Sequence, residues 1–192
     1  GTALKWWYLT DGGHFENTAA YELIRRRLPL VVVCDDGADP GYRFGDLANL
    51  VRKARLDFGT EISFLDGKDL ADDPLGRFFG PLDELTREGP LAFATKHAAL
   101  ARLAYPDGST GVLVVLKPAL TGEEPLDLLE YHAVHPVFPQ EPTGDQFFDE
   151  AQWESYRKLG EFIGTRFCEV LSGRPLAPET FIRPAAPLAG TP

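Results

Sequence analysis

An apolar run at residues 28–35, with the sequence LPLVVVCD, constrains the fold of this chain more than any other feature. Such a short run is typical of a strand that is buried on both faces, as in a parallel sheet covered by helices. Residues 3–9 (ALKWWYL) favour a strand by their aromatic content, and residues 16–27 (ENTAAYELIRRR) favour a helix that ends before Pro29. The pattern predicts a strand–helix–strand unit, which is typical of an α/β fold.

The rest of the chain alternates helical and strand-like patterns without an internal repeat. The expected elements are a helix at 44–59, a strand at 60–66, an irregular surface excursion at 67–90, a β-hairpin at 96–120, a short helix at 125–136 and a long amphipathic helix at 149–173. We therefore expect a three-layer α/β sandwich with a mostly parallel sheet, plus a β-hairpin and a long carboxyl-terminal amphipathic helix. Residues 1–172 form one domain in this interpretation, and residues 173–192 form a tail rich in proline and alanine.

Length and charge limit the classes of function that the chain can have. Its 192 residues suit one domain, and its net charge of −10 disfavours binding to nucleic acid or to an anionic membrane surface. Cys34 and Cys168 are too far apart to form a disulfide framework, and no apolar run reaches the roughly 20 residues of a membrane-spanning helix. We expect a chain that is soluble as presented, and cytoplasmic or membrane-associated in the full-length protein. Because the sequence contains no methionine, we expect it to be a fragment or a processed product.

The segment YLTDGGHF at residues 8–15 places an acidic residue and two glycines between the first predicted strand and the first predicted helix. Asp-Gly is a common turn pair, so Asp11 can be a turn-former. Functional groups of an open parallel sheet also gather beyond the carboxyl ends of strands, where Asp11 would stand. Gly12 and Gly13 would let a reacting group approach closely. The residues alone leave two interpretations open, Asp11 as a turn residue and Asp11 as a general base.

Two long blocks carry a resemblance to a known family. Residues 10–59, from TDGGHFENTAAYELIRRR to VRKARLDFG, and residues 104–160, from AYPDGSTGVLVVLKPAL to ESYRKLG, resemble segments of patatin-like phospholipases and related acyl hydrolases. The similarity covers most of residues 5–165. It implies a patatin-like three-layer sandwich, of which residues 1–172 are the carboxyl-terminal part. It also implies hydrolysis of a lipid ester, such as a phospholipid, by a serine–aspartate dyad.

The same resemblance assigns roles to residues of the opening segment. Asp11 is the acid of the dyad, which takes the proton of the attacking serine and later activates water. Gly12, Gly13, His14 and Asn17 would shape the site around it. The mechanism that the family implies requires no histidine and no cofactor.

The chain departs from the family at the nucleophile. The G-x-S-x-G motif of a nucleophile elbow is absent, and so is the glycine-rich oxyanion loop. The serines, none of which has the glycine pattern of an elbow, are Ser63, Ser109, Ser155 and Ser172. We therefore expect a preceding amino-terminal segment of the same protein to supply the serine and the oxyanion donors, and to make any contact with a membrane. The alternative is a non-catalytic scaffold or interaction module that retains a patatin-like frame.

Other candidate groups have simpler structural interpretations. His132 and His135 could share a helix face as metal ligands, but no third ligand is apparent nearby. Four aspartates in one stretch lack the ligand spacing of a calcium-binding loop, namely Asp35, Asp36, Asp39 and Asp46. We therefore predict neither a metal site nor a bound cofactor.

Overall fold

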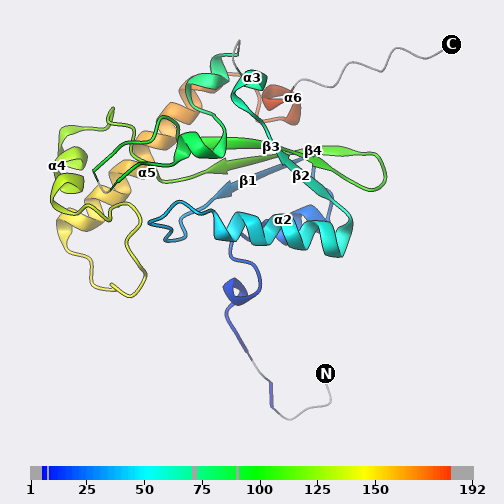
Figure 1. The fold of residues 1–192 in the computed structure, drawn as a ribbon, viewed down its shortest axis with the longest axis horizontal. Helices are drawn as coiled ribbons and strands as arrows, with labels where there is room; N and C mark the ends of the chain where they lie inside the picture. The colour runs from blue at the N-terminus through cyan, green and yellow to red at the C-terminus, as the bar shows by residue number, and fades with distance from the viewer. Residues whose placement is uncertain (1–5, 8, 71–72, 90, 183–192) are drawn as a thin grey trace.

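Four strands form one sheet at the centre of the molecule (Figure 1). The computed structural model describes residues 6–7, 9–70, 73–89 and 91–182. The strands are β1 (Leu30–Cys34), β2 (Glu61–Phe64), β3 (Ala98–Ala104) and β4 (Thr110–Leu116), and they lie in the order β1-β4-β3-β2. β1 pairs with β4 in parallel, whereas β3 pairs in antiparallel fashion with both β4 and β2. The chain is therefore a mixed α/β protein.

The β3–β4 hairpin occupies the middle of this sheet, so the prediction of a mostly parallel sheet is wrong. Strands joined by a short turn pair in antiparallel fashion, and this hairpin lies between β1 and β2 rather than beside them. The hairpin predicted at 96–120 is itself confirmed. Leu100 and Leu103 of β3 are fully buried, as are Leu113 and Val114 of β4. An element expected as an appendage thus forms the core of the sheet.

Three of the predicted helices are confirmed, and one of them is α4 (Leu126–Val134), which fills the range predicted at 125–136. α2 (Gly45–Phe58) ends at Gly59, whose φ of 63° lies in the left-handed region that favours glycine. α5 (Glu150–Leu171) begins after Asp149, whose side chain accepts a hydrogen bond from the backbone N–H of Gln152 at 2.8 Å. The remaining helices are α1 (Ala20–Arg25), α3 (Gly67–Leu70) and α6 (Pro178–Phe181), and the 3-10 helices are η1 (Gly12–His14), η2 (Pro74–Arg77) and η3 (Leu82–Leu85).

α1 is shorter than the helix predicted at 16–27. The buried carboxylate of Glu16 accepts hydrogen bonds from the backbone N–H groups of Thr18, at 2.7 Å, and Tyr21, at 3.3 Å. These bonds hold residues 16–19 in a turn, so the helix begins only at residue 20. At the other end, Arg27 has a φ of 55°, which ends the helix before β1.

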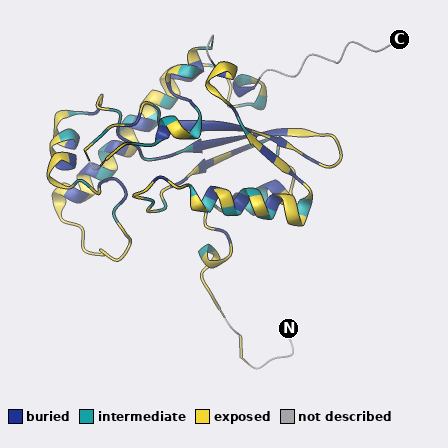
Figure 2. Cartoon of the chain, in the orientation of Figure 1, coloured by how far each residue is buried: buried dark blue, intermediate teal, exposed yellow. Residues whose placement is uncertain are grey.

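Helices cover both faces of the sheet (Figure 1). On one face, Ile24 of α1 and Leu50 of α2 share a buried cluster with Leu113 of β4. On the other face, Leu159 of α5 shares a second cluster with Leu100 of β3. Figure 2 shows the central strands as the most deeply buried part of the chain. Among the described helices, none has the length and the apolar character needed to cross a bilayer.

Residues 67–90 are irregular, as predicted, but they are not confined to the surface. The described part of this segment contributes several side chains to the core, namely Leu70, Leu75, Phe78, Phe79 and Leu85. Phe79 also forms an isolated bridge with Ala98 at the start of β3. Short 3-10 helices therefore close one end of the core without the sustained periodicity that identifies long helices in a sequence.

β1 is an edge strand, so the prediction that it is buried on both faces is wrong. Val31 and Val33 lie in the cluster beneath α1 and α2, whereas Val32 and Cys34 on the opposite face are exposed. Among the described strands, only β4 lies beside β1. An apolar strand is buried on both faces when strands flank both of its edges and helices cover both of its faces. Within the described sheet, β1 has a neighbour at one edge only.

The free side of β1 presents unpaired backbone groups. The carbonyl of Pro29 accepts a hydrogen bond from Val112, and the N–H of Asp35 donates one to Leu116, each at 2.9 Å. Along a parallel strand, successive residues direct their backbone N–H and C=O groups to opposite sides. The carbonyl of Pro29 and the N–H of Asp35 point to β4, so the N–H and C=O groups of Val32 point away from β4. Within the described chain, this edge is open.

The strand predicted at 3–9 falls partly outside the described residues, which omit 1–5 and 8. Trp6, Trp7 and Leu9 are exposed and belong to no strand, so the prediction is wrong for these three residues. Their side chains have no sheet surface to bury them, because no described strand pairs with them. Figure 1 shows the described part of this segment extending away from the sheet.

The crossover through α2 determines where a strand that leads into α1 would lie. β1 and β2 run in the same direction, and the chain passes from one to the other through α2. α1 packs on the same face of the sheet as α2. Parallel crossovers are right-handed in about 98% of cases. A strand that entered β1 through α1 would therefore lie at the open edge of β1, parallel to it.

The start of the predicted tail is packed rather than extended. α6 brings Phe181 and Ile182 into the core, where the ring of Phe181 lies 5.9 Å from that of Phe79. The boundary predicted at residue 173 therefore does not coincide with the end of the packed region. The rest of the predicted tail, residues 183–192, lies outside the described residues.

The open edge of β1 predicts that the chain self-associates. Unpaired strand edges with apolar side chains pair readily with other chains, so we expect dimers or larger assemblies in sedimentation velocity. Val32→Lys should shift the distribution towards monomer, because a charge on an edge strand opposes pairing. Leu56→Lys, at an exposed apolar position on α2, is the matched control and should leave the distribution unchanged. A wild-type chain that remains monomeric, or equal effects of both substitutions, would contradict the prediction.

Candidate functional site

Asp11 caps a short 3-10 turn. Its Oδ1 atom accepts a hydrogen bond from the backbone N–H of Gly13 at 2.8 Å, and η1 follows directly. Nδ1 of His14 lies 2.7 Å from Oγ1 of Thr10, which holds the imidazole on the same turn. Asp11 and His14 are exposed. The turn-forming role of Asp11 is therefore present in the structure.

Asn17 connects this turn to the start of α2. Its Nδ2 atom donates a hydrogen bond to Oδ2 of Asp46 at 2.8 Å. Its Oδ1 atom lies so close to Gly13 that a Cβ atom there would stand only 2.7 Å away. Position 13 therefore has room for glycine alone while Asn17 keeps this orientation. All four residues predicted to shape the site, Gly12, Gly13, His14 and Asn17, lie on or beside the Asp11 turn.

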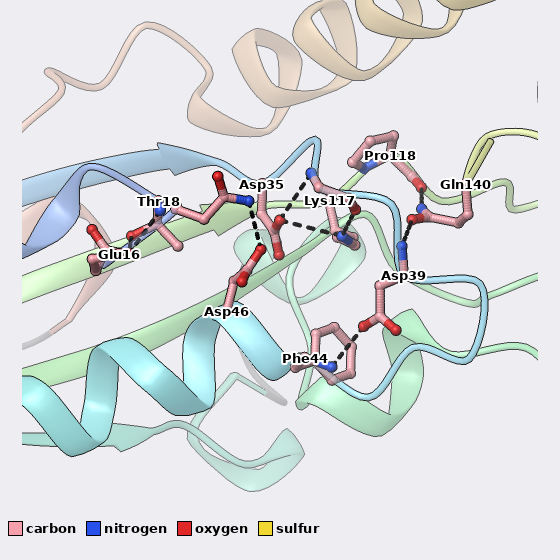
Figure 3. Close-up of polar contacts among 11 residues, drawn as sticks. Glu16, Thr18, Asp35, Asp39, Phe44, Asp46, Lys117, Pro118 and Gln140 are labelled. Atoms are coloured by element: carbon pink, nitrogen blue, oxygen red, sulfur yellow. Dashed lines mark hydrogen bonds and ion pairs between the residues drawn. The ribbon is translucent and has the colours of Figure 1, made fainter. Parts of the chain in front are cut away.

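A buried ion pair lies where β1 and β4 end (Figure 3). Asp35 directly follows β1 and Lys117 directly follows β4, and the two strands are parallel neighbours, so both residues emerge at the same edge. Nζ of Lys117 lies 3.3 Å from Oδ1 of Asp35, and the side chains are only 1% and 6% exposed, respectively. Lys117 also donates a hydrogen bond to the carbonyl of Gly37 at 2.9 Å.

Burial sets the electrostatics of this pair. Loss of hydration raises the pKa of the Asp35 carboxyl above its ordinary value, and the Asp46 carboxylate nearby acts in the same direction. The ammonium of Lys117 and the N–H of Gly37 oppose this rise in the pKa, because both stabilise the charged form of Asp35. An isolated ion at this depth would cost several kcal/mol. The burial of each charged side chain therefore depends on the opposite charge of the other.

Gly37 is the point at which these side chains converge. A Cβ atom built on it would lie 3.0 Å from Oδ2 of Asp46, 3.3 Å from Oδ1 of Asp35 and 3.5 Å from Nδ2 of Asn17. The chain of contacts thus runs from Lys117 through Asp35 and Gly37 to Asn17. It joins the Asp11 turn to the carboxyl ends of two parallel strands.

Further hydrogen bonds hold the loop at 35–44 over the strand ends (Figure 3). The amide of Gln140 accepts from the N–H of Asp39 and donates to the carbonyl of Pro118, each at 2.9 Å. The carboxylate of Asp39 accepts from the N–H of Phe44 at 2.7 Å. The loop encloses a hollow of about 260 Å³ that is lined in part by Asp35, Asp39, Asp46 and Lys117. A small polar group fits such a space.

Lys117 and Gln140 are the residues that the sequence analysis misses. VVLK at the end of the second hairpin strand is an ordinary strand end, and the lysine gains its importance only from the strand beside it. Asp35 after VVVC carries the same kind of signal, an ionisable residue directly behind a buried strand. Two such signals on parallel neighbours would have identified the pair.

The other candidate groups do not form sites. Nδ1 of His132 lies 3.1 Å from the carbonyl of Phe138, and the ring of His135 stacks on Tyr131 at 4.1 Å. Within the described residues, no three His, Cys, Asp or Glu side chains are arranged to hold a metal ion. The serines lie inside β2 (Ser63), in the β3–β4 turn (Ser109), inside α5 (Ser155) and at its C-cap (Ser172), so none stands at a strand-to-helix elbow.

Models of known protein families, curated proteins and solved structures were compared with the chain, and none of them matches it. The patatin-like assignment therefore remains a prediction from the sequence.

The buried pair predicts a large and specific effect on stability. Lys117→Met should lower the free energy of unfolding by about 3–5 kcal/mol, because it leaves the Asp35 carboxylate buried without a counter-charge. The double variant Lys117→Met/Asp35→Leu should regain most of this loss, and urea denaturation measures both. Arg157→Met, which removes exposed ion pairs with Glu154 and Glu161, is the control and should change stability little. A Lys117→Met chain as stable as the wild type would show that the pair is not formed.

Proposed function

We propose that the chain is the carboxyl-terminal part of a patatin-like acyl hydrolase, which cleaves lipid esters with a serine–aspartate dyad. Asp11 is the base of the dyad, and a preceding segment of the same protein supplies the serine and the oxyanion donors. The two blocks at 10–59 and 104–160 that resemble the family support this assignment. The substrate class, a phospholipid or a related lipid ester, follows from the same resemblance.

The open edge of β1 is the observation that carries the proposal. Asp35 and Lys117 mark the carboxyl ends of β1 and β4, and a further parallel strand on the open edge would end beside them. The handedness of the crossovers favours this position for a strand that leads into α1. Trp6, Trp7 and Leu9 form no strand in this chain, so the proposal requires them to pair on this edge when the preceding segment is present. That pairing would bring the Asp11 carboxylate to the edge of the sheet beside Asp35. The preceding segment would then pair beyond this strand and add the nucleophile.

The proposed reaction has two steps. The serine hydroxyl attacks the ester carbonyl while Asp11 accepts its proton, and the alcohol leaves with that proton as the acyl-serine forms. Water then attacks the acyl-serine and gives a proton to Asp11, and the fatty acid leaves as the serine regains its proton. Backbone N–H groups of the preceding segment stabilise the oxyanion of each tetrahedral intermediate. Contact with a membrane, where the lipid ester lies, belongs to that segment as well.

A non-catalytic scaffold is the second candidate function. In its favour, Asp11 already has a structural role as the cap of η1, and none of the four serines stands at an elbow. The two functions differ in the residues that precede residue 1 in the protein. A G-x-S-x-G motif after a strand there identifies the enzyme, and its absence there identifies the scaffold.

Substitution of Asp11 distinguishes its role in the turn from its proposed role as the general base. In the protein that includes the preceding segment, Asp11→Asn keeps an oxygen that can accept the hydrogen bond from Gly13, but it removes the base. Hydrolysis of a phospholipid or short acyl ester should fall by at least about two orders of magnitude, with the melting temperature nearly unchanged.

Asp66→Asn is the matched control for this experiment. Asp66 also precedes a glycine, and its Oδ1 atom accepts a hydrogen bond from the N–H of Lys68 at 2.8 Å, as Asp11 does from Gly13. Its substitution should leave hydrolysis at the wild-type rate. His14→Ala should cost roughly tenfold or less, because no histidine lies in the proton path. Wild-type activity of Asp11→Asn would refute the dyad assignment.

The chain alone should be inactive. Half a dyad cannot form an acyl-enzyme, so we expect no hydrolysis of short acyl esters above background and no serine labelled by a fluorophosphonate probe. Mass spectrometry of the probe-treated chain tests this directly. Turnover together with a label on Ser63, Ser109, Ser155 or Ser172 would mean that the nucleophile lies within the chain.

A further inference from the structure

α5 begins at the opposite end of this helix from α6 (Figure 1), and three exposed aromatic residues lie close together in the sequence at this start. Phe147 is 93% exposed, Trp153 is 64% exposed and Phe148 is 42% exposed. The three residues lie within seven positions of the sequence. Large aromatic side chains in water at one place are unusual for a surface that binds nothing.

Local structure holds these side chains at the surface. The side-chain amide of Gln152, itself buried, donates hydrogen bonds to Glu141 at 3.1 Å and to Asp145 at 3.0 Å. These bonds fix the loop at 141–148 against the first turn of α5. Phe148 stacks on Tyr156 at 5.6 Å, and this contact leaves one side of its ring exposed. The aromatic side chains thus stand on a folded frame and not on a loose end.

Carboxylates outnumber cations around the aromatic residues, although Arg157 and Lys158 follow Trp153 closely on α5. Residues 118–156 contain no lysine or arginine, and their acids are Glu123, Glu124, Asp127, Glu130, Glu141, Asp145, Asp149, Glu150 and Glu154. Asp149 and Glu150 are stabilised at the start of α5 by the helix dipole, which gives them a structural role. The same role does not explain Phe147 and Trp153, which add nothing to the core. Glu154 is already paired with Arg157 at 2.7 Å, so the acidic aromatic surface is defined here as Phe147, Phe148 and Trp153 with Glu141, Asp145, Asp149 and Glu150.

We propose that the acidic aromatic surface binds a cationic amphipathic segment of a partner protein, one that alternates apolar side chains with lysine or arginine. Aromatic residues supply large contact areas at low entropic cost, and tryptophan is prominent among the residues that dominate binding energies. The carboxylates select the charge of the partner and speed its approach. Lysine and arginine side chains also bind favourably over aromatic rings.

The same charge argues against a lipid surface as the occupant. Anionic headgroups attract basic segments, and the residues of this surface offer them carboxylates instead. A cationic protein segment satisfies both the aromatic and the acidic part of the surface. The proposal is independent of the acyl hydrolase function, because it involves neither Asp11 nor the edge of β1.

Titration of the chain with a synthetic amphipathic helix tests the proposal. The probe is a peptide of 18 residues with leucine on one face and lysine on the other, and the reference peptides replace every lysine by glutamate or every leucine by serine. Isothermal calorimetry should show binding of the first peptide only. The double variant Phe147→Ser/Trp153→Ser should weaken binding by at least about tenfold, whereas Leu56→Ser, an exposed apolar position on α2, should not. Circular dichroism verifies that both variants fold.

Two further experiments locate the binding site and test whether it binds a membrane. Glu150→Gln should weaken binding of the cationic peptide more than Glu88→Gln, because both residues are exposed acids and only Glu150 belongs to the acidic aromatic surface. Equal effects of the two substitutions would show that the peptide responds to the overall charge of −10, and would overturn the proposal. Binding of the leucine–serine peptide as strong as that of the cationic peptide, or no loss in the double variant, would overturn it as well. Sedimentation of the chain with zwitterionic phosphatidylcholine vesicles, lost in the double variant, would assign the surface to a membrane instead.

Discussion

The parallel pairing of β1 with β4 is the constraint on which the rest of the structure depends. It connects β1, near the start of the described chain, to a hairpin that follows much later, and it thereby places β1 at one edge of the sheet. Because parallel neighbours end at the same edge, it also brings Asp35 and Lys117 within 3.3 Å of each other. Neither residue could be buried without the other. One backbone pairing thus creates both the sheet and the charged centre at its edge.

The buried pair in turn orders the loop that follows β1. Lys117 has spare donors after it meets Asp35, and one of them bonds the carbonyl of Gly37. A Cβ atom at Gly37 would make tight contacts with the carboxylates of Asp46 and Asp35, at 3.0 and 3.3 Å, and an ordinary contact with Asn17, at 3.5 Å. The hydrogen bond from Asn17 to Asp46 links the segment after the Asp11 turn to the start of α2, beside this loop. A lone Asp-Gly-Gly turn on the surface would have no such support.

The sequence predicts those parts of the fold that are determined by residues close together in the chain. α2 and α5 are long enough for their periodicity to be visible, and Gly59 and Asp149 mark one end of each. The order of the strands has no local cause, so the hairpin at the centre of the sheet is not predictable from its own residues. The apolar composition of β1 suggests burial on both faces, but burial of Val32 depends on a neighbour that the sequence pattern cannot supply.

The same distinction applies to the candidate site. Asn17 is predicted to shape the site only through a family resemblance, and its structural partner Asp46 lies 29 residues away. Lys117 carries no signal of its own, because a lysine after a strand is ordinary until a carboxylate faces it across a parallel pair. The surface at the start of α5 is different, since FFDEAQWE shows its aromatic and acidic character directly in the sequence. Its exposure is what the sequence could not show, because an aromatic stripe on a helix packs into the core more often than it faces water.

The two interpretations of Asp11, as a turn residue and as a general base, are physically compatible. A carboxylate has two oxygen atoms, and the turn uses one of them, Oδ1, to accept the hydrogen bond from Gly13. A base needs only one lone pair directed at the proton that it removes, and Oδ2 can supply it. The hydrogen bond to Oδ1 fixes the carboxyl plane and so limits the directions in which Oδ2 can point. A turn that positions the carboxylate is therefore what a dyad without histidine requires, since in such a dyad no imidazole mediates between acid and serine.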